Sequence, residues 1–336
     1  MKPRDALIIA AVVLIAGFAA ADAIRGRAEH TVSAPTEGTQ TTPTRPPGPQ
    51  PQAGAPKGWP IGRLHGSLVF TDTRDCRIRV IGLAGGVERP VAKFGGDCQL
   101  WAPPVTQHVA YGLGPSSADG FSPFRIADVE HPDRELGGYR ALFGVVLWSQ
   151  DGQRIAWCGR RHTGFDLQVG GAARRLPRCP VAYTPNNRIA YAVADRVVVG
   201  TKTVLRTKGG VTLVHFGTDG SLAVIIDGER IERYDAHGRV TAVVPVGGAE
   251  GRNAVFSPTN CAVAFPPNDR GRVTIVYLGC FLGRLFNAHG HAVAWSPDGV
   301  WLAVAEPRTI AFDRVIGSAR TIRWPASAAQ LAWQAR

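Results

Sequence analysis

The main pattern along the chain is a short cassette that recurs about every forty residues. Each copy begins with an aromatic residue, continues through a polar turn and ends in a short apolar run. Trp148 opens WSQDGQRIAWCG, Phe216 opens FGTDGSLAVII and Trp295 opens WSPDGVWLAV. In such a turn the Asp accepts backbone hydrogen bonds and the Gly adopts positive φ, so each cassette predicts two antiparallel strands. Further copies begin at Trp101, Tyr183, Phe256 and Trp333.

Each repeat has room for four short strands. Apolar residues before the aromatic, such as 145–147, predict an innermost strand, and the run after the turn, such as 302–304, predicts a second. Weaker, basic segments such as 204–206 and 239–241 predict outermost strands. A period near forty with four strands per unit is typical of an all-β fold, the β-propeller. Third strands are expected at 124–130, 166–169, 196–199, 230–234 and 273–278.

Seven aromatic positions predict seven blades, with six or eight as alternatives because the copy at Trp101 is degenerate. The first blade lacks an innermost strand of its own, since Ser67–Phe70 reads as a second strand and Cys76–Ile81 as a third. We expect 328–334 to supply the missing strand. Pairing of the two chain ends would close the ring and leave no open gap between blades.

The FSP, WSPDG and WSQDG cassettes resemble the WD40-like repeats of bacterial, exported β-propellers of the TolB type. The resemblance covers about Leu64 to Arg336 and is strongest from Trp295 to Val304. It implies a scaffold that binds other proteins and has no conserved catalytic site. Proteins of the TolB type carry an α/β domain before the propeller, and this chain has a different segment there.

The first 62 residues predict an anchor and a tether. Residues 1–24 contain an apolar run preceded by Lys2 and Arg4, which is typical of a transmembrane anchor or a cleaved signal peptide. Residues 25–62 are rich in Pro and Thr and poor in large apolar residues, so we expect a disordered tether. The propeller is expected over 63–336. Whether residues 1–24 are an anchor or a cleaved signal peptide, we expect the propeller to be exported.

Six cysteines all lie after the tether, and an even number in an exported chain favours disulfides. Cys261 and Cys280 are expected opposite each other across a hairpin. Each of the other two pairs joins an end of one predicted strand to the entry of the next blade on the same face. We therefore predict the pairs Cys76–Cys98, Cys158–Cys179 and Cys261–Cys280. No spacing matches a zinc site, so no metal is expected.

The chain carries a formal charge of +12, with 38 basic and 26 acidic residues. Positive charge on outer strands opposes edge-to-edge aggregation, and it also attracts an anionic wall polymer. Nucleic acid is not expected as a partner of an exported chain. The basic residues placed on or near outer strands are Arg89, Lys93, Arg174, Arg175, Arg206, Lys208, Arg239, Arg284, Arg320 and Arg323.

A search for catalytic motifs finds no Gly-x-Ser-x-Gly, His-Glu-x-x-His, phosphate-binding loop or dinucleotide fingerprint. We expect no catalytic residues and no cofactor, and the sequence does not identify a binding site. The favoured function is a monomeric, membrane-tethered, extracytoplasmic scaffold that binds proteins of the cell envelope. It would be single-pass, or secreted if the signal is cleaved. The alternatives are an enzyme acting on a glycan or lactone at the central channel and a binder of an anionic envelope polymer.

Overall fold

A computed structural model describes residues 59, 64–92, 98–104, 108–114, 120–129, 135–142, 146–159, 163–246, 254–265, 271–280, 288–318 and 320–335. The chain divides into two compact units, 1–50 and 51–336, and all described residues belong to the second. The predictions for residues 1–58 lie outside the described residues. Among the described residues, no helix has the length and apolar character needed to cross a membrane.

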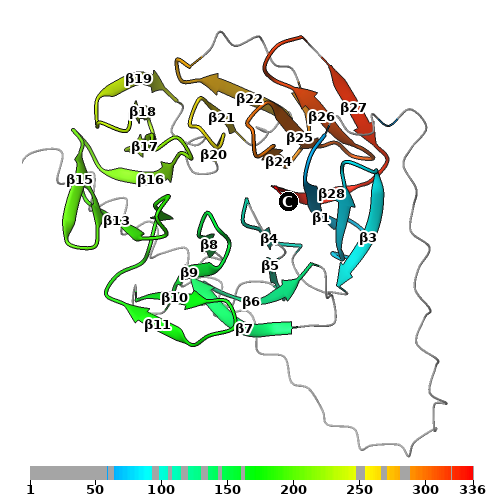
Figure 1. The fold of residues 1–336 in the computed structure, drawn as a ribbon, viewed down its shortest axis with the longest axis horizontal. Coiled ribbons are helices and arrows are strands. Elements are labelled where there is room, and N and C mark those ends of the chain that lie inside the picture. Colours follow the sequence, from blue (N-terminus) through cyan, green and yellow to red (C-terminus); the bar gives the residue numbers. More distant parts are fainter. Residues whose placement is uncertain are drawn as a thin grey trace, which may run out of the picture. The chain divides into compact units, whose positions relative to one another are not determined.

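The second unit is a ring of seven antiparallel sheets, each with four strands (Figure 1). This arrangement confirms the all-β, seven-bladed β-propeller, and it excludes six or eight blades. Blade 1 consists of β28 (Ala328–Gln334), β1 (Ser67–Asp72), β2 (Ile78–Gly82) and β3 (Val87–Ala92). Blade 2 consists of β4 (Leu100–Trp101), β5 (His108–Gly112), β6 (Phe121–Asp128) and β7 (Glu135–Leu142).

The remaining blades follow in chain order, each from its innermost to its outermost strand. Blade 3 has β8 (Val146–Trp148), β9 (Arg154–Cys158), β10 (Gly164–Gln168) and β11 (Ala173–Leu176), and blade 4 has β12 (Ala182–Tyr183), β13 (Ile189–Val193), β14 (Arg196–Val199) and β15 (Lys202–Arg206). Blade 5 has β16 (Val211–Phe216), β17 (Leu222–Ile226), β18 (Arg230–Tyr234) and β19 (Val240–Pro245). Blade 6 has β20 (Val255–Phe256), β21 (Ala262–Phe265), β22 (Arg272–Tyr277) and β23 (Ala288–His289), and blade 7 has β24 (Val293–Trp295), β25 (Trp301–Ala305), β26 (Ile310–Arg314) and β27 (Thr321–Trp324).

The ring is closed by strands from distant parts of the sequence, as predicted. β28 pairs antiparallel with β1, from Ser67 opposite Gln334 to Thr71 opposite Gln330. Several predicted boundaries shift, and β6 begins at Phe121 rather than at Phe124. Cys76 lies before β2 rather than in the strand, because it adopts a φ of 54°. Residues with this left-handed backbone do not continue a strand.

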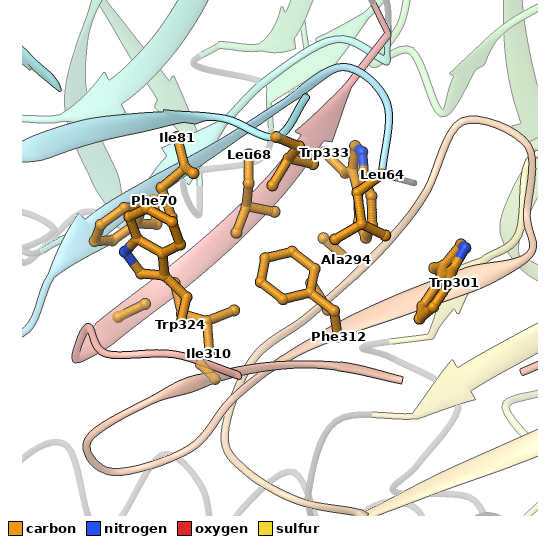
Figure 2. Packing of buried hydrophobic residues seen from close by; sticks show 14 of the residues in the cluster. Leu64, Leu68, Phe70, Ile81, Ala294, Trp301, Ile310, Phe312, Trp324 and Trp333 are labelled. Atoms are coloured by element: carbon orange, nitrogen blue, oxygen red, sulfur yellow. The ribbon is translucent and has the colours of Figure 1, made fainter. Parts of the chain in front are cut away.

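Apolar clusters fill the spaces between neighbouring blades, and the largest joins blades 1 and 7. Figure 2 shows Leu68 and Trp333 of blade 1 close to Phe312 of blade 7. The rings of Phe312 and Trp333 meet edge to face, with centroids 5.4 Å apart. The seam where the ring closes is therefore packed mainly by large aromatic side chains.

Trp59 belongs to this cluster, although it lies in the segment expected to be a tether. Its ring packs edge to face against Trp324 and Phe312, with centroids 4.8 and 5.6 Å away. Its indole N–H donates to the Leu83 carbonyl at 3.0 Å, and only 8% of the residue is exposed. The packing of the ring therefore includes a residue four positions before the expected start of the propeller.

We expect Trp59→Ala to destabilise the propeller by about 3–5 kcal/mol, because it leaves a cavity among aromatic rings and removes the hydrogen bond to Leu83. Urea unfolding of the full chain measures the change. The control is Val243→Ala, which shortens a side chain on an exposed strand and should change stability by less than about 0.5 kcal/mol. Equal stability of Trp59→Ala and the native protein would show that the ring does not depend on this contact.

Candidate functional site

The tryptophans of the repeat fasten neighbouring blades together. The indole N–H of Trp148 donates to the Trp101 carbonyl of blade 2 at 3.1 Å. In the same way Trp295 of blade 7 donates to Val255 of blade 6 at 2.8 Å. These aromatic residues are therefore structural, and they are not candidates for binding a ligand.

The polar turns of the cassettes are also satisfied internally. The Ser296 hydroxyl donates to Asp298 at 2.5 Å, and it accepts the Trp301 backbone N–H at 2.8 Å. Ser149, Asp151 and Arg154 repeat this arrangement in blade 3. The side chains that gave the sequence its repeat thus bind the backbone of their own turns.

A buried carboxylate links blades 3 and 4. The Asp166 side chain in β10 is fully buried and accepts hydrogen bonds from Arg154 and, at 3.1 Å, from Arg174. The Tyr183 hydroxyl of β12 donates to the same carboxylate at 2.8 Å. Burial, reinforced by the nearby Asp166 charge, raises the pKa of Tyr183, so the hydroxyl stays protonated and remains a donor. All these groups have partners, which indicates a structural connection between the blades.

A second polar network joins blades 5 and 6 and contains the residue types of a catalytic triad. His215 Nδ1 lies 2.6 Å from Asn260 Oδ1, and Asn260 Nδ2 donates to the Ser221 hydroxyl at 3.0 Å. That hydroxyl donates to Asp219 at 2.5 Å. A nucleophilic serine would need its hydroxyl directed at the histidine, whereas here Asn260 lies between them. The network therefore holds two blades together.

The three predicted disulfides are present, and no cysteine is free. Cys76–Cys98 connects blade 1 to the entry of blade 2, and Cys158–Cys179 connects blade 3 to the entry of blade 4. Cys261–Cys280 lies within blade 6, with a Cα–Cα distance of 5.2 Å. Three disulfides are typical of proteins that fold in an oxidising compartment.

The described residues contain no group of three or more His, Cys, Asp or Glu side chains that could hold a metal ion. The expected site residues, the six cysteines, are brought together only as these three pairs. Sequence reasoning missed Asp166 and Asn260, because their partners lie on other strands of the same blade or on the neighbouring blade and leave no short-range motif.

Among the described residues, every exposed large apolar side chain lies on the outermost strand of a blade. They are Val87 of β3, Val204 of β15, and Val240 and Val243 of β19. β19 has the sequence VTAVVP and no charged residue, and Val243 is 56% exposed. The other outer strands contain Arg, Lys or Glu, apart from the two-residue β23. The free edge of β19 is therefore the candidate interaction site.

The structure places the basic residues of the outer region as follows. Arg89 lies in β3, Arg174 and Arg175 lie in β11, Arg206 lies in β15 and Arg323 lies in β27. Arg239 and Arg320 come directly before β19 and β27, and Lys208 follows β15 by two residues. Lys93 and Arg284 lie outside the described residues.

Neither the protein-family models nor the curated proteins give a match to this chain. Among solved structures, it is similar to a chain in a crystal structure of a mitotic checkpoint complex, with 16% identity over 88% of this chain and 100% of that chain and a TM-score of 0.51. The β-propeller domain of Cps50 (Swd1) from Myceliophteria thermophila gives 14% identity, coverages of 70% and 89%, and a TM-score of 0.44. Hydrazine synthase from Kuenenia stuttgartiensis gives 15% identity, coverages of 64% and 76%, and a TM-score of 0.42. At such identities the likeness concerns the fold alone, the β-propeller.

The His215 network predicts a dependence of stability on pH. Burial lowers the pKa of His215 below its usual 6.5, so the unfolded chain takes up a proton at higher pH than the folded protein does. Stability is therefore fully present above about pH 6.5 and falls as the pH drops toward the lower pKa of the folded protein, by at most about 1.4 kcal/mol per pH unit.

The variant His215→Asn keeps an amide donor near the position of Nδ1 but does not titrate. Urea unfolding between pH 7.5 and pH 5 should show a smaller loss of stability in this variant than in the native protein. His237→Asn, in the exposed turn before β19 and outside the network, is the matched control for the loss of a histidine. If the native protein and His215→Asn lost stability equally between pH 7.5 and pH 5, His215 would not be the source of the pH dependence.

Proposed function

We propose that the chain is an exported protein-interaction module that binds partners through the edges of its outer strands, with β19 as the principal docking edge. The observation that supports this proposal most directly is the exposed, uncharged sequence of β19. Propellers expose the outer edge of each blade, and most blades protect that edge with charge. An unprotected edge is a template for strand addition by a partner.

The geometry of β19 suits this role. One edge of the strand pairs antiparallel with β18, which leaves the other edge without a neighbouring strand in blade 5. Ala242 and Val244 pack against the cluster between blades 5 and 6 and hold the strand in place. Thr241 and Val243 are exposed. A partner strand would find a rigid edge with main-chain donors and acceptors and an apolar surface beside it.

We further propose that the propeller is tethered to the membrane and lies on its extracytoplasmic side. Residues 1–24 would anchor or export the chain, and residues 25–58, which end before the packed Trp59, would provide the tether. Three disulfides and the resemblance to exported propellers of the TolB type support this location. The partner would then be a protein of the cell envelope, bound by a monomeric propeller.

A photo-activated crosslinking residue at Thr241 or Val243 should give discrete adducts with a partner protein in living cells. The same residue at Ala236, in the exposed turn before β19, is the control and should give none. Val243→Lys places a charge on the docking edge and should abolish the adducts formed at Thr241. Val87→Lys, which changes an exposed valine of β3, should leave them intact. Absence of adducts at both β19 positions, or full adducts in Val243→Lys, would contradict the proposal.

Export can be tested through the cysteines. In intact cells the full chain should resist thiol alkylation, because all six cysteines are in disulfides. A chain lacking residues 1–24 should remain in the reducing cytoplasm and become alkylated at its cysteines, as mass spectrometry would show. Oxidised cysteines in the truncated chain would argue against export by this segment.

A further inference from the structure

The positive charge of the chain is concentrated in two adjacent blades. Residues 146–210, which cover blades 3 and 4, contain eleven basic and three acidic residues. Residues 211–246, which form blade 5, contain three basic and five acidic residues. Most of the net charge of +12 therefore comes from one sector of the ring. If the charge served only to protect strand edges, it would be spread evenly over the blades.

This charge is exposed at the outer strands of blades 3 and 4. Arg174 and Arg175 are exposed residues of the four-residue β11, and Lys202 and Arg206 are exposed residues of β15. Arg178 and Lys208 follow these strands and are also exposed. We call these six residues the basic edge.

Among the described residues, Arg174 is the one member of the basic edge that pairs with an acidic residue of the two blades. Asp166 is fully buried and is already shared by Arg154 and Arg174. Asp195 pairs with Arg196 at 3.5 Å. Among the residues that the structure describes, neither Arg175 nor Arg206 makes an ion pair. On blades 5 and 7, by contrast, Arg233 pairs with Asp219 and Arg323 pairs with Glu306, each at 3.2 Å.

One feature of β15 adds electrostatic repulsion. Arg206 lies directly opposite Arg196 of β14, so two positive charges occupy adjacent positions on neighbouring strands. Like charges in this arrangement repel, and an anionic group placed between them would remove the repulsion. Protection of a strand edge would need only one such charge.

We propose that the basic edge of blades 3 and 4 binds an acidic, extended polypeptide segment. Arginine forks match carboxylates in pairs of parallel hydrogen bonds. β11 and β15 are the outermost strands of their sheets, so each also has a main-chain edge with which a peptide can pair. This surface is distinct from β19, so it is tested independently of the docking edge proposed above.

The same observations disfavour nucleic acid and other polyanions. Single-stranded nucleic acid binds where aromatic side chains offer stacking surfaces between basic residues. The two tyrosines of blade 4, Tyr183 and Tyr191, are buried at 5% and 9% exposure. Phe165 of blade 3, opposite Arg175, already stacks on Trp157 with ring centroids 5.4 Å apart. A phosphate polymer has no main-chain amides and makes no use of a strand edge.

The test uses the full chain and a fluorescein-labelled peptide of eight residues that alternates glutamate with threonine, with binding followed by fluorescence anisotropy. We expect binding that weakens at least about tenfold between 50 and 300 mM salt, because the contact is electrostatic. The variant Arg175→Glu with Arg206→Glu should weaken binding by about tenfold or more. Arg239→Glu with Arg320→Glu changes the net charge equally, at exposed positions beside the outer strands of blades 5 and 7, and should change binding less than about twofold.

Three outcomes would overturn the proposal. Equal loss of binding in the two double variants would mean that only the overall field attracts the peptide. Equal binding of a peptide whose threonines are N-methylated would exclude pairing with a strand edge. Tighter binding of inorganic polyphosphate or of a twelve-residue oligothymidine than of the acidic peptide would assign the surface to another class of ligand. If the first double variant does not fold, Arg178→Glu with Lys208→Glu replaces it, with the same expected loss.

Discussion

The pairing of β28 with β1 is the contact on which the rest of the propeller depends. The other six blades are built from strands that follow one another along the chain, whereas blade 1 combines residues 67–92 with residues 328–334. This closure costs chain entropy, because it joins segments more than 230 residues apart. Until it forms, blades 1 and 7 cannot enclose the aromatic cluster between them. The large aromatic side chains at this seam, Trp59 included, offset that entropy with buried apolar area.

The other seams are secured by different means. Disulfides lie at the junctions from blade 1 to 2 and from blade 3 to 4, while no disulfide joins blades 7 and 1. Polar networks around Asp166 and Asn260 join blades 3 to 4 and 5 to 6. Each seam thus has either a covalent bond, a satisfied polar network or a large apolar cluster. Because these groups are used for assembly, the proposed docking edges lie on the outer strands instead.

Much of the fold could be predicted, because the repeat is local. Ser296, Asp298 and Gly299 form their turn through contacts within five residues, and Ser149 and Asp151 repeat these contacts in blade 3. The cysteine pairs followed once the strands were placed. Trp59 could not be predicted, since the Pro-rich sequence around it gives no sign of packing. The edge of β19 and the basic edge also needed the structure, because charge along the sequence does not tell which residues remain exposed and unpaired.

The outer edges of this ring differ in chemistry from blade to blade. β19 offers an uncharged, apolar edge, while β11 and β15 offer arginine and lysine. β15 and β19 belong to adjacent blades, and the apolar cluster between these blades fixes the position of one blade against the other. A rigid ring with two such edges can select partners of opposite kinds, one apolar and one acidic, and hold them one blade apart. The exposed side chains of the two edges, apart from Arg174 with its bond to Asp166, take no part in holding the blades together, so they can change by mutation without loss of the fold.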